Sequence, residues 1–168
     1  MCVFSACGQV LFGLIMAGAA VMTGFATFKQ NEGKLYNWDC LLDEIKCNEL
    51  ERKQILYMRL VAAFTCLSFI FELICIGYDL ATFYICCLRD YIIHPLSCLA
   101  FLTFSFLMTV VIIYAVVQNH GFGYQTDEED YGYTYWLIVA STVLAGIDII
   151  VASITVFFAE TTVFSFSM

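Results

Sequence analysis

The sequence predicts an all-α membrane protein, namely a four-helix transmembrane bundle with a short disulfide-tied extracellular loop. The chain has 168 residues, of which 62% are hydrophobic and only 13% are charged, whereas about a quarter of an average soluble protein is charged. Four apolar stretches are each long enough to cross a bilayer, which takes about 20 helical residues. An aromatic content of 17% excludes a disordered chain. With 7 basic against 15 acidic residues, we expect membrane lipids and other membrane proteins as partners, and no nucleic acid.

The first two helices are predicted from the first two apolar stretches. Residues 3–28 carry no charge, so they lack the basic start of a signal peptide and are expected to form the first span. The second stretch, residues 55–88, exceeds one span. We therefore predict a helix over about residues 55–80 that either continues past the bilayer or bends near Gly77. The charged residues that interrupt this stretch are Arg59, Glu72 and Asp79.

The last two helices complete a single four-transmembrane domain over residues 1–168. Polar residues and the only proline mark the connection before them: Arg89, Asp90 and Pro95. The third helix is predicted over about residues 96–118, and the fourth over about 135–158 with Asp148 inside it. Four spans place both termini on one side of the membrane. Loop 1 (about residues 29–54) and loop 3 (about residues 119–134) lie on the other side.

Two signals disagree on which side faces the cytosol. The positive-inside rule places loop 1 there, because the loop and its edge hold six basic residues: Lys29, Lys34, Lys46, Arg52, Lys53 and Arg59. Cys40 and Cys47 argue the opposite, since two cysteines in a short polar loop form a disulfide in an oxidising compartment. The alternative is a pair of free thiols in a cytosolic loop. We predict a multi-pass plasma-membrane protein with its loops outside and its termini in the cytoplasm.

The remaining chemistry-bearing residues do not form an enzyme motif. The chain contains no HExxH, GxSxG, P-loop or CxxC sequence, and His94 and His120 fall on opposite sides of the membrane. We therefore expect no enzymatic activity, no metal and no cofactor. Cys86 and Cys87 lie at the membrane edge on the terminal side, where cysteines are candidates for palmitoylation. The alternative is that they form an inert pair at the end of a helix.

Loop 1 and the helix ends carry a recognisable set of residues. Trp38 precedes the cysteine pair in Tyr36-Asn37-Trp38-Asp39-Cys40, Arg59 lies near the outer end of the second helix, and the third helix ends in Tyr114-Ala115. In this respect the chain resembles the claudin and peripheral-myelin-protein superfamily. The resemblance implies a first outer loop closed by a Cys40–Cys47 disulfide, with Arg59 bracing that loop. Loop 1 is too short to hold the full outer β-sheet of the family.

Two of these residues have a second interpretation. Trp38 is expected either to pack as a wedge between loop 1 and the helix ends or to lie at headgroup level as an interface anchor. Arg59 is expected to brace loop 1 or to extend its guanidinium to the interface.

The first helix has one face of small residues. Gly13, Ala17, Ala20 and Gly24 follow the spacing that places side chains on one stripe of a helix. Small residues let helices approach closely in lipid. We interpret the stripe as a helix-packing interface, either within the bundle or for docking another subunit.

Two acidic residues fall deep inside predicted spans. Glu72 and Asp148 lie at similar depths below the outer face, so we expect them to share one layer that faces the bundle interior. Three hypotheses follow: they bind a proton or cation, they pair with bases of a partner channel, or they bond to helix hydroxyls. The hydroxyls considered are those of Ser68, Thr109 and Ser141.

The sequence therefore favours a non-enzymatic structural protein of a cell junction or barrier. Such a protein acts by lateral and trans protein–protein contacts, through a homo-oligomer or a larger complex. Two alternatives stay open: an auxiliary subunit of an ion channel or other large membrane complex, and a small proton- or ion-coupled carrier.

Overall fold

The structure is a computed structural model of the whole chain. It describes residues 2–28, 38–43, 45, 47, 49–84, 89–117 and 132–166. Side chains are described for residues 8–28, 38–43, 45, 47, 55–82, 96–117 and 132–154.

The described residues form four long helices and one short helix. They are α1 (Cys2–Phe28), α2 (Trp38–Leu42), α3 (Glu49–Tyr84), α4 (Arg89–Val117) and α5 (Tyr133–Phe166). The four long helices contain apolar segments of 21 to 28 residues, which are long enough to cross a membrane. These segments are Gly8–Phe28, Ile55–Thr82, Leu96–Val117 and Tyr133–Ile154. The predicted all-helical, four-span fold is confirmed.

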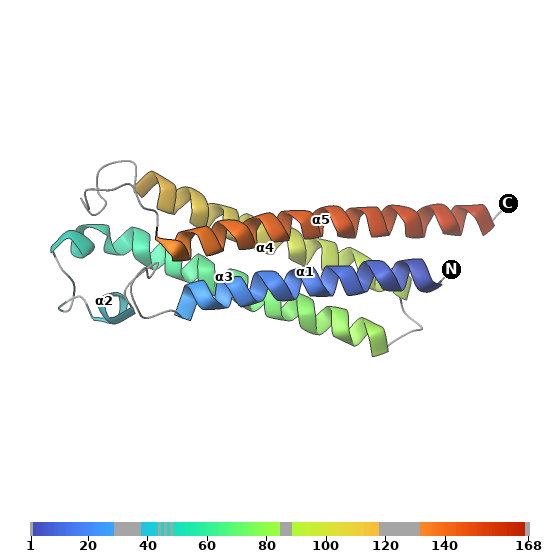
Figure 1. The fold of residues 1–168 in the computed structure, drawn as a ribbon, viewed down its shortest axis with the longest axis horizontal. Coiled ribbons are helices and arrows are strands. Elements are labelled where there is room, and N and C mark those ends of the chain that lie inside the picture. Colours follow the sequence, from blue (N-terminus) through green and yellow to red (C-terminus); the bar gives the residue numbers. More distant parts are fainter. Residues whose placement is uncertain are drawn as a thin grey trace.

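The long helices pack side by side as a four-membered bundle (Figure 1). Helix α1 lies between α3 and α5, and α4 completes the ring by contacting the same two helices. Helix α1 begins and α5 ends at one end of the bundle, whereas α2 lies at the other end (Figure 1). We call the described residues between Trp38 and Cys47, namely 38–43, 45 and 47, the cap.

The buried side chains of each long helix recur every three or four residues. On α3 seven of the buried positions form a regular series, and Ala62 is buried beside it. The seven are Val61, Thr65, Ser68, Glu72, Cys75, Asp79 and Thr82. These seven alternate in steps of four and three, which is the spacing of a heptad repeat and of left-handed helix packing. On α4 the buried positions follow the same rule: Leu96, Ala100, Thr103, Leu107 and Val110.

The interior is divided into two apolar clusters. One lies toward the cap and includes Val61, Leu107 and Ile138. The other lies toward the termini and includes Phe12 and Met16. Polar residues occur between the members of the two clusters on every long helix: Thr23 on α1, Glu72 on α3, Thr103 on α4 and Asp148 on α5. The bundle therefore has buried polar residues at more than one level in the middle of its apolar core. We call the level of Thr23 and Glu72 the polar layer.

Several helix boundaries differ from the prediction. Helix α3 is continuous through Gly77 to Tyr84, so the second helix continues beyond one span. Helix α4 begins at Arg89, and Pro95 lies inside it instead of ending the connection. Pro95 is the seventh residue of α4, past the first turn, so its missing N–H removes one backbone hydrogen bond from the helix. Helix α5 extends to Phe166, beyond the predicted end at 158, because a helix need not stop where the bilayer does.

Candidate functional site

The cap is closed by a disulfide between Cys40 and Cys47. Cys40 lies in the short helix α2 and is buried, at 5% exposure. The backbone N–H of Asp43 donates to the Asp39 carbonyl at 3.0 Å, and the Ile45 N–H donates to Asp43 Oδ1 at 3.2 Å. The predicted disulfide is thus present, and the cap is a helical turn with no strand among its described residues.

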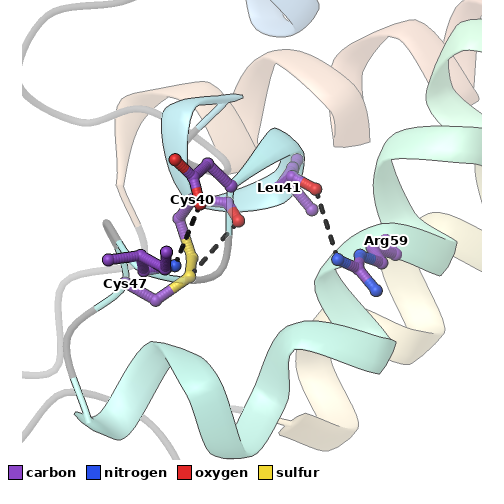
Figure 2. The surroundings of a disulfide bond; sticks show 6 residues. Cys40, Leu41, Cys47 and Arg59 are labelled. Carbon is purple, nitrogen blue, oxygen red and sulfur yellow. Dashed lines mark hydrogen bonds between the residues drawn. A yellow bond between two sulfur atoms is a disulfide. The ribbon is translucent and has the colours of Figure 1, made fainter.

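Two side chains fasten the cap to the bundle. The indole Nε1 of Trp38 donates to the carbonyl of Thr27 at the end of α1, at 3.0 Å, and the ring packs against the cap-side apolar cluster. Arg59 on α3 donates from Nη2 to the Leu41 carbonyl at 3.5 Å, and Figure 2 shows its guanidinium directed at α2. Trp38 therefore packs as a wedge, and Arg59 contacts the loop as a brace.

The cap presents two exposed apolar side chains. Leu42 and Ile45 are 82% and 85% exposed, more than any other large apolar residue of the described chain. The other exposed large apolar residues all lie within the four spans, where lipid covers them. Leu42 and Ile45 lie outside the spans and have no such cover.

Glu72 joins three helices at the polar layer. It has no exposed surface, and its Oε1 accepts hydrogen bonds from Thr23 Oγ1 at 3.0 Å and from Ser141 Oγ at 3.4 Å. Thr23 and Ser141 are also bonded to each other at 2.7 Å, so α1, α3 and α5 meet at this carboxyl. Of the hydroxyls predicted to bond the acids, only Ser141 does so. Those of Ser68 and Thr109 donate to carbonyls of their own helices.

The second interior acid pairs with a residue that sequence reasoning left unassigned. Asp148 interacts electrostatically with Asp79 on α3, and Asp79 is only 3% exposed. Ser141 contacts Glu72 and so marks its level on α5. Asp148 lies seven residues beyond Ser141, about 10 Å further along α5, and Asp79 lies seven residues beyond Glu72 on α3. Asp148 is therefore at the level of Asp79 instead of Glu72. The signal for Asp79 was available in its spacing, because it follows Glu72 by one heptad on the buried face of α3.

The interior acids face the inside of the bundle instead of the lipid. Glu72 and Asp148 have no exposed surface. A base on the outside of the bundle, such as one from a partner channel, cannot reach their carboxyl groups in this packing. Four of their buried oxygens have no hydrogen-bond partner among the described residues: Glu72 Oε2, Asp79 Oδ1, Asp148 Oδ1 and Asp148 Oδ2.

The small-residue stripe of α1 lies against α3. A Cβ on Gly13 would come within 2.5 Å of Asp79 Oδ2, and one on Gly24 within 3.1 Å of the Phe69 ring. Ala20 is buried at 6% exposure, and Ala17 is half-buried. The stripe therefore packs within the bundle, where Gly13 provides the space that the Asp79 carboxyl occupies.

Two further predictions concern palmitoylation and metal binding. Cys86 and Cys87 lie outside the described residues, so their palmitoylation stays a prediction. Within the part of the chain that the structure describes, no group of three or more His, Cys, Asp and Glu side chains is arranged to hold a metal ion.

Comparisons with protein-family models, curated proteins and solved structures found no match. The resemblance to the claudin superfamily therefore stays a prediction.

Proposed function

We propose that this four-span membrane protein is a non-enzymatic structural component of a cell junction or barrier, and that it contacts further copies of itself through the cap. The observation that carries the proposal is the exposure of Leu42 and Ile45, at 82% and 85%, on a disulfide-closed segment outside the spans. Exposed apolar side chains outside the membrane mark surfaces that bind other molecules.

The cap suits this role because it is held in place before any partner binds. The disulfide closes it, Trp38 fastens it to α1, and Arg59 fastens it to α3. A contact surface that is already ordered loses less conformational entropy on binding. The same Trp–disulfide–Arg arrangement supports the proposed likeness to the claudin and peripheral-myelin-protein superfamily.

The disulfide also supports the proposed orientation. Disulfides persist in oxidising compartments and are rare in the cytosol. We therefore place the cap on the extracellular face of the plasma membrane and both termini in the cytoplasm. This orientation goes against the Lys and Arg count of loop 1, and acids contribute little to that rule. The six acids of the loop match its bases in number: Glu32, Asp39, Asp43, Glu44, Glu49 and Glu51.

The test is co-isolation of two differently tagged full-length copies from one cell, together with imaging of borders between cells that carry different tags. A Leu42→Ser, Ile45→Ser variant should weaken self-association at least tenfold. Burying each side chain contributes about 1.5–3 kcal/mol, and about 1.4 kcal/mol corresponds to a factor of ten. Asp39→Asn, an exposed change in the same helix, is the matched control and should associate normally.

Three results would contradict the proposal. The cap variant could associate as well as the wild type while retaining its disulfide in a non-reducing digest. The wild type could fail to self-associate and collect nowhere at cell borders. It could instead co-purify in fixed ratio with one larger membrane protein, which would favour an auxiliary subunit.

A further inference from the structure

The membrane-spanning part of the bundle has an unbalanced charge. Its four spans contain three acidic residues, Glu72, Asp79 and Asp148, and a single basic residue, Arg59. Arg59 lies near the cap end and donates to the Leu41 carbonyl. No basic side chain of the described spans is therefore available to neutralise the acids, although a buried carboxylate without a counter-ion is strongly unfavourable in a membrane.

Two of the acids lie at one level in the bundle. Asp79 follows Glu72 by seven residues on α3, Asp148 follows Ser141 by seven on α5, and Glu72 accepts a hydrogen bond from Ser141 at 3.4 Å. Both helices run from the cap toward the termini (Figure 1), and the two carboxyl groups are close enough to interact electrostatically. They are 3% and 0% exposed, and neither oxygen of Asp148 has a hydrogen-bond partner among the described residues. Asp79 Oδ1 is likewise unpartnered, and Asp79 Oδ2 lies against Gly13.

The carboxyl groups of Asp79 and Asp148 have acceptor oxygens but lack hydrogen-bond donors to fill them among the described residues. Carboxylate oxygens only accept hydrogen bonds, whereas a protonated carboxyl also donates one. Two carboxylates held together in a site shielded from water share a proton for this reason, and because their like charges repel. Among the described residues no group of three or more His, Cys, Asp and Glu side chains is arranged to hold a metal ion, so we take the proton as the cation of this pair.

We propose that Asp79 and Asp148 form a proton-binding pair in the interior of the bundle. A proton delivered by water bonds to one carboxylate oxygen, which converts that carboxylate to a carboxylic acid and removes one negative charge. One negative charge then remains on the pair, and nothing is oxidised or reduced. This inference concerns the bundle interior and stands independently of the proposed role of the cap.

The surroundings of the pair contain few other groups that titrate. On α3 they are Glu72 and Cys75, and Cys75 interacts with all three acids. Helix α4 contributes the hydroxyl of Thr103, which contacts Cys75, and the span of α1 contains no titratable side chain. Protonation of the pair is thus separable by spectroscopy from that of Glu72.

The test is infrared spectroscopy of the full chain in lipid nanodiscs, since a protonated carboxyl has a C=O stretching band that a carboxylate lacks. We expect this band at neutral pH and its loss as the pH is raised. Asp79→Asn and Asp148→Asn should each reduce it, whereas Asp39→Asn, an exposed acid of the cap, should leave it unchanged. Labelling of the wild-type aspartate carboxyl carbons with carbon-13 should shift the band, which keeps the test valid if a variant fails to fold.

Three outcomes would overturn the proposal. The first is a wild-type spectrum at neutral pH with no protonated-carboxyl band. The second is a band that shifts neither with labelled aspartate nor in the Asp79 and Asp148 variants and disappears only in Glu72→Gln. The third is loss of the band on addition of Na⁺ or K⁺ at constant pH, which would make a metal cation the ligand.

Discussion

Replacing Glu72 by alanine should destabilise the bundle by about 2–3 kcal/mol, whereas replacing it by glutamine should cost less than about 1 kcal/mol. Glu72 has no exposed surface, so alanine leaves a cavity, and such truncations cost roughly 2–5 kcal/mol. Alanine also removes the acceptor at Oε1. The hydroxyls of Thr23 and Ser141 keep their mutual bond, and Ser141 keeps the Ala19 carbonyl at 3.2 Å. The two hydrogen bonds lost at Oε1 are therefore worth only about 0.6 kcal/mol each in a membrane.

Part of this cost is offset in the alanine variant. The Glu72 Oε2 atom has no hydrogen-bond partner in the described structure, and its removal relieves an unfavourable burial. The net value of about 2–3 kcal/mol therefore lies at the low end of the range for buried truncations. Glutamine keeps the volume and an acceptor oxygen at Oε1, so it preserves the junction of α1, α3 and α5.

The assay is reversible unfolding in mixed micelles, titrated with a denaturing detergent and followed by tryptophan fluorescence. Leu73→Ala is the matched control, because Leu73 is the next residue on α3 and is 50% exposed on the lipid side. It should lower the free energy of unfolding by less than the Glu72→Ala change does. The reasoning would be refuted if glutamine were as costly as alanine, or if alanine had no effect.

Three further changes test other contacts. Gly13→Ala should cost about 1 kcal/mol, at the low end for overpacking, because its Cβ would lie 2.5 Å from Asp79 Oδ2 and only the end of that side chain must move. A Cβ on Gly77 meets nothing within 4 Å, so Gly77→Ala should not destabilise in the same titration. Equal effects of the two would contradict the packing of α1. Trp38→Phe removes the indole donor to the Thr27 carbonyl, so it should lower the free energy of unfolding by about 1 kcal/mol. It should also make the backbone amides of the cap exchange hydrogen faster with solvent. An unchanged exchange rate would argue against packing of Trp38 as a wedge. Replacing both Cys40 and Cys47 by serine should lower the free energy of unfolding by about 2.4 kcal/mol, because the unfolded chain is no longer constrained by a loop closed across seven residues. Equal stability of the oxidised and the reduced wild-type protein would contradict this prediction.

The sequence was sufficient to predict the features that depend on local pattern. Runs of apolar residues identify the spans whatever their packing, because each span must satisfy its own backbone hydrogen bonds in lipid. Cys40 and Cys47 are close along the chain, so their pairing needs no tertiary information. The contact of Arg59 with the loop followed from family resemblance, and the structure places that side chain on the Leu41 carbonyl.

The features that depend on how helices turn about their axes were harder to predict. Depth alone suggested that Glu72 and Asp148 share a layer, whereas Glu72 meets Thr23 and Ser141 while Asp148 meets Asp79. The apolar residues of a membrane helix face both lipid and protein, so hydropathy does not reveal the buried face. The heptad of polar residues on α3 does reveal it. A search for polar positions at that spacing would have added Asp79 to the candidate site.

The arrangement of the cap on the extracellular face is the central claim, and the lysines of the chain allow a direct test. All four, Lys29, Lys34, Lys46 and Lys53, lie between the first two spans. Intact cells expressing the full chain are treated with a membrane-impermeant amine reagent, and the labelled peptides are mapped without reduction. We predict lysine labelling before permeabilisation, an unlabelled N-terminal amine and a Cys40–Cys47 cross-linked peptide. Labelling of the lysines only after permeabilisation, together with free thiols at both cysteines, would contradict the account.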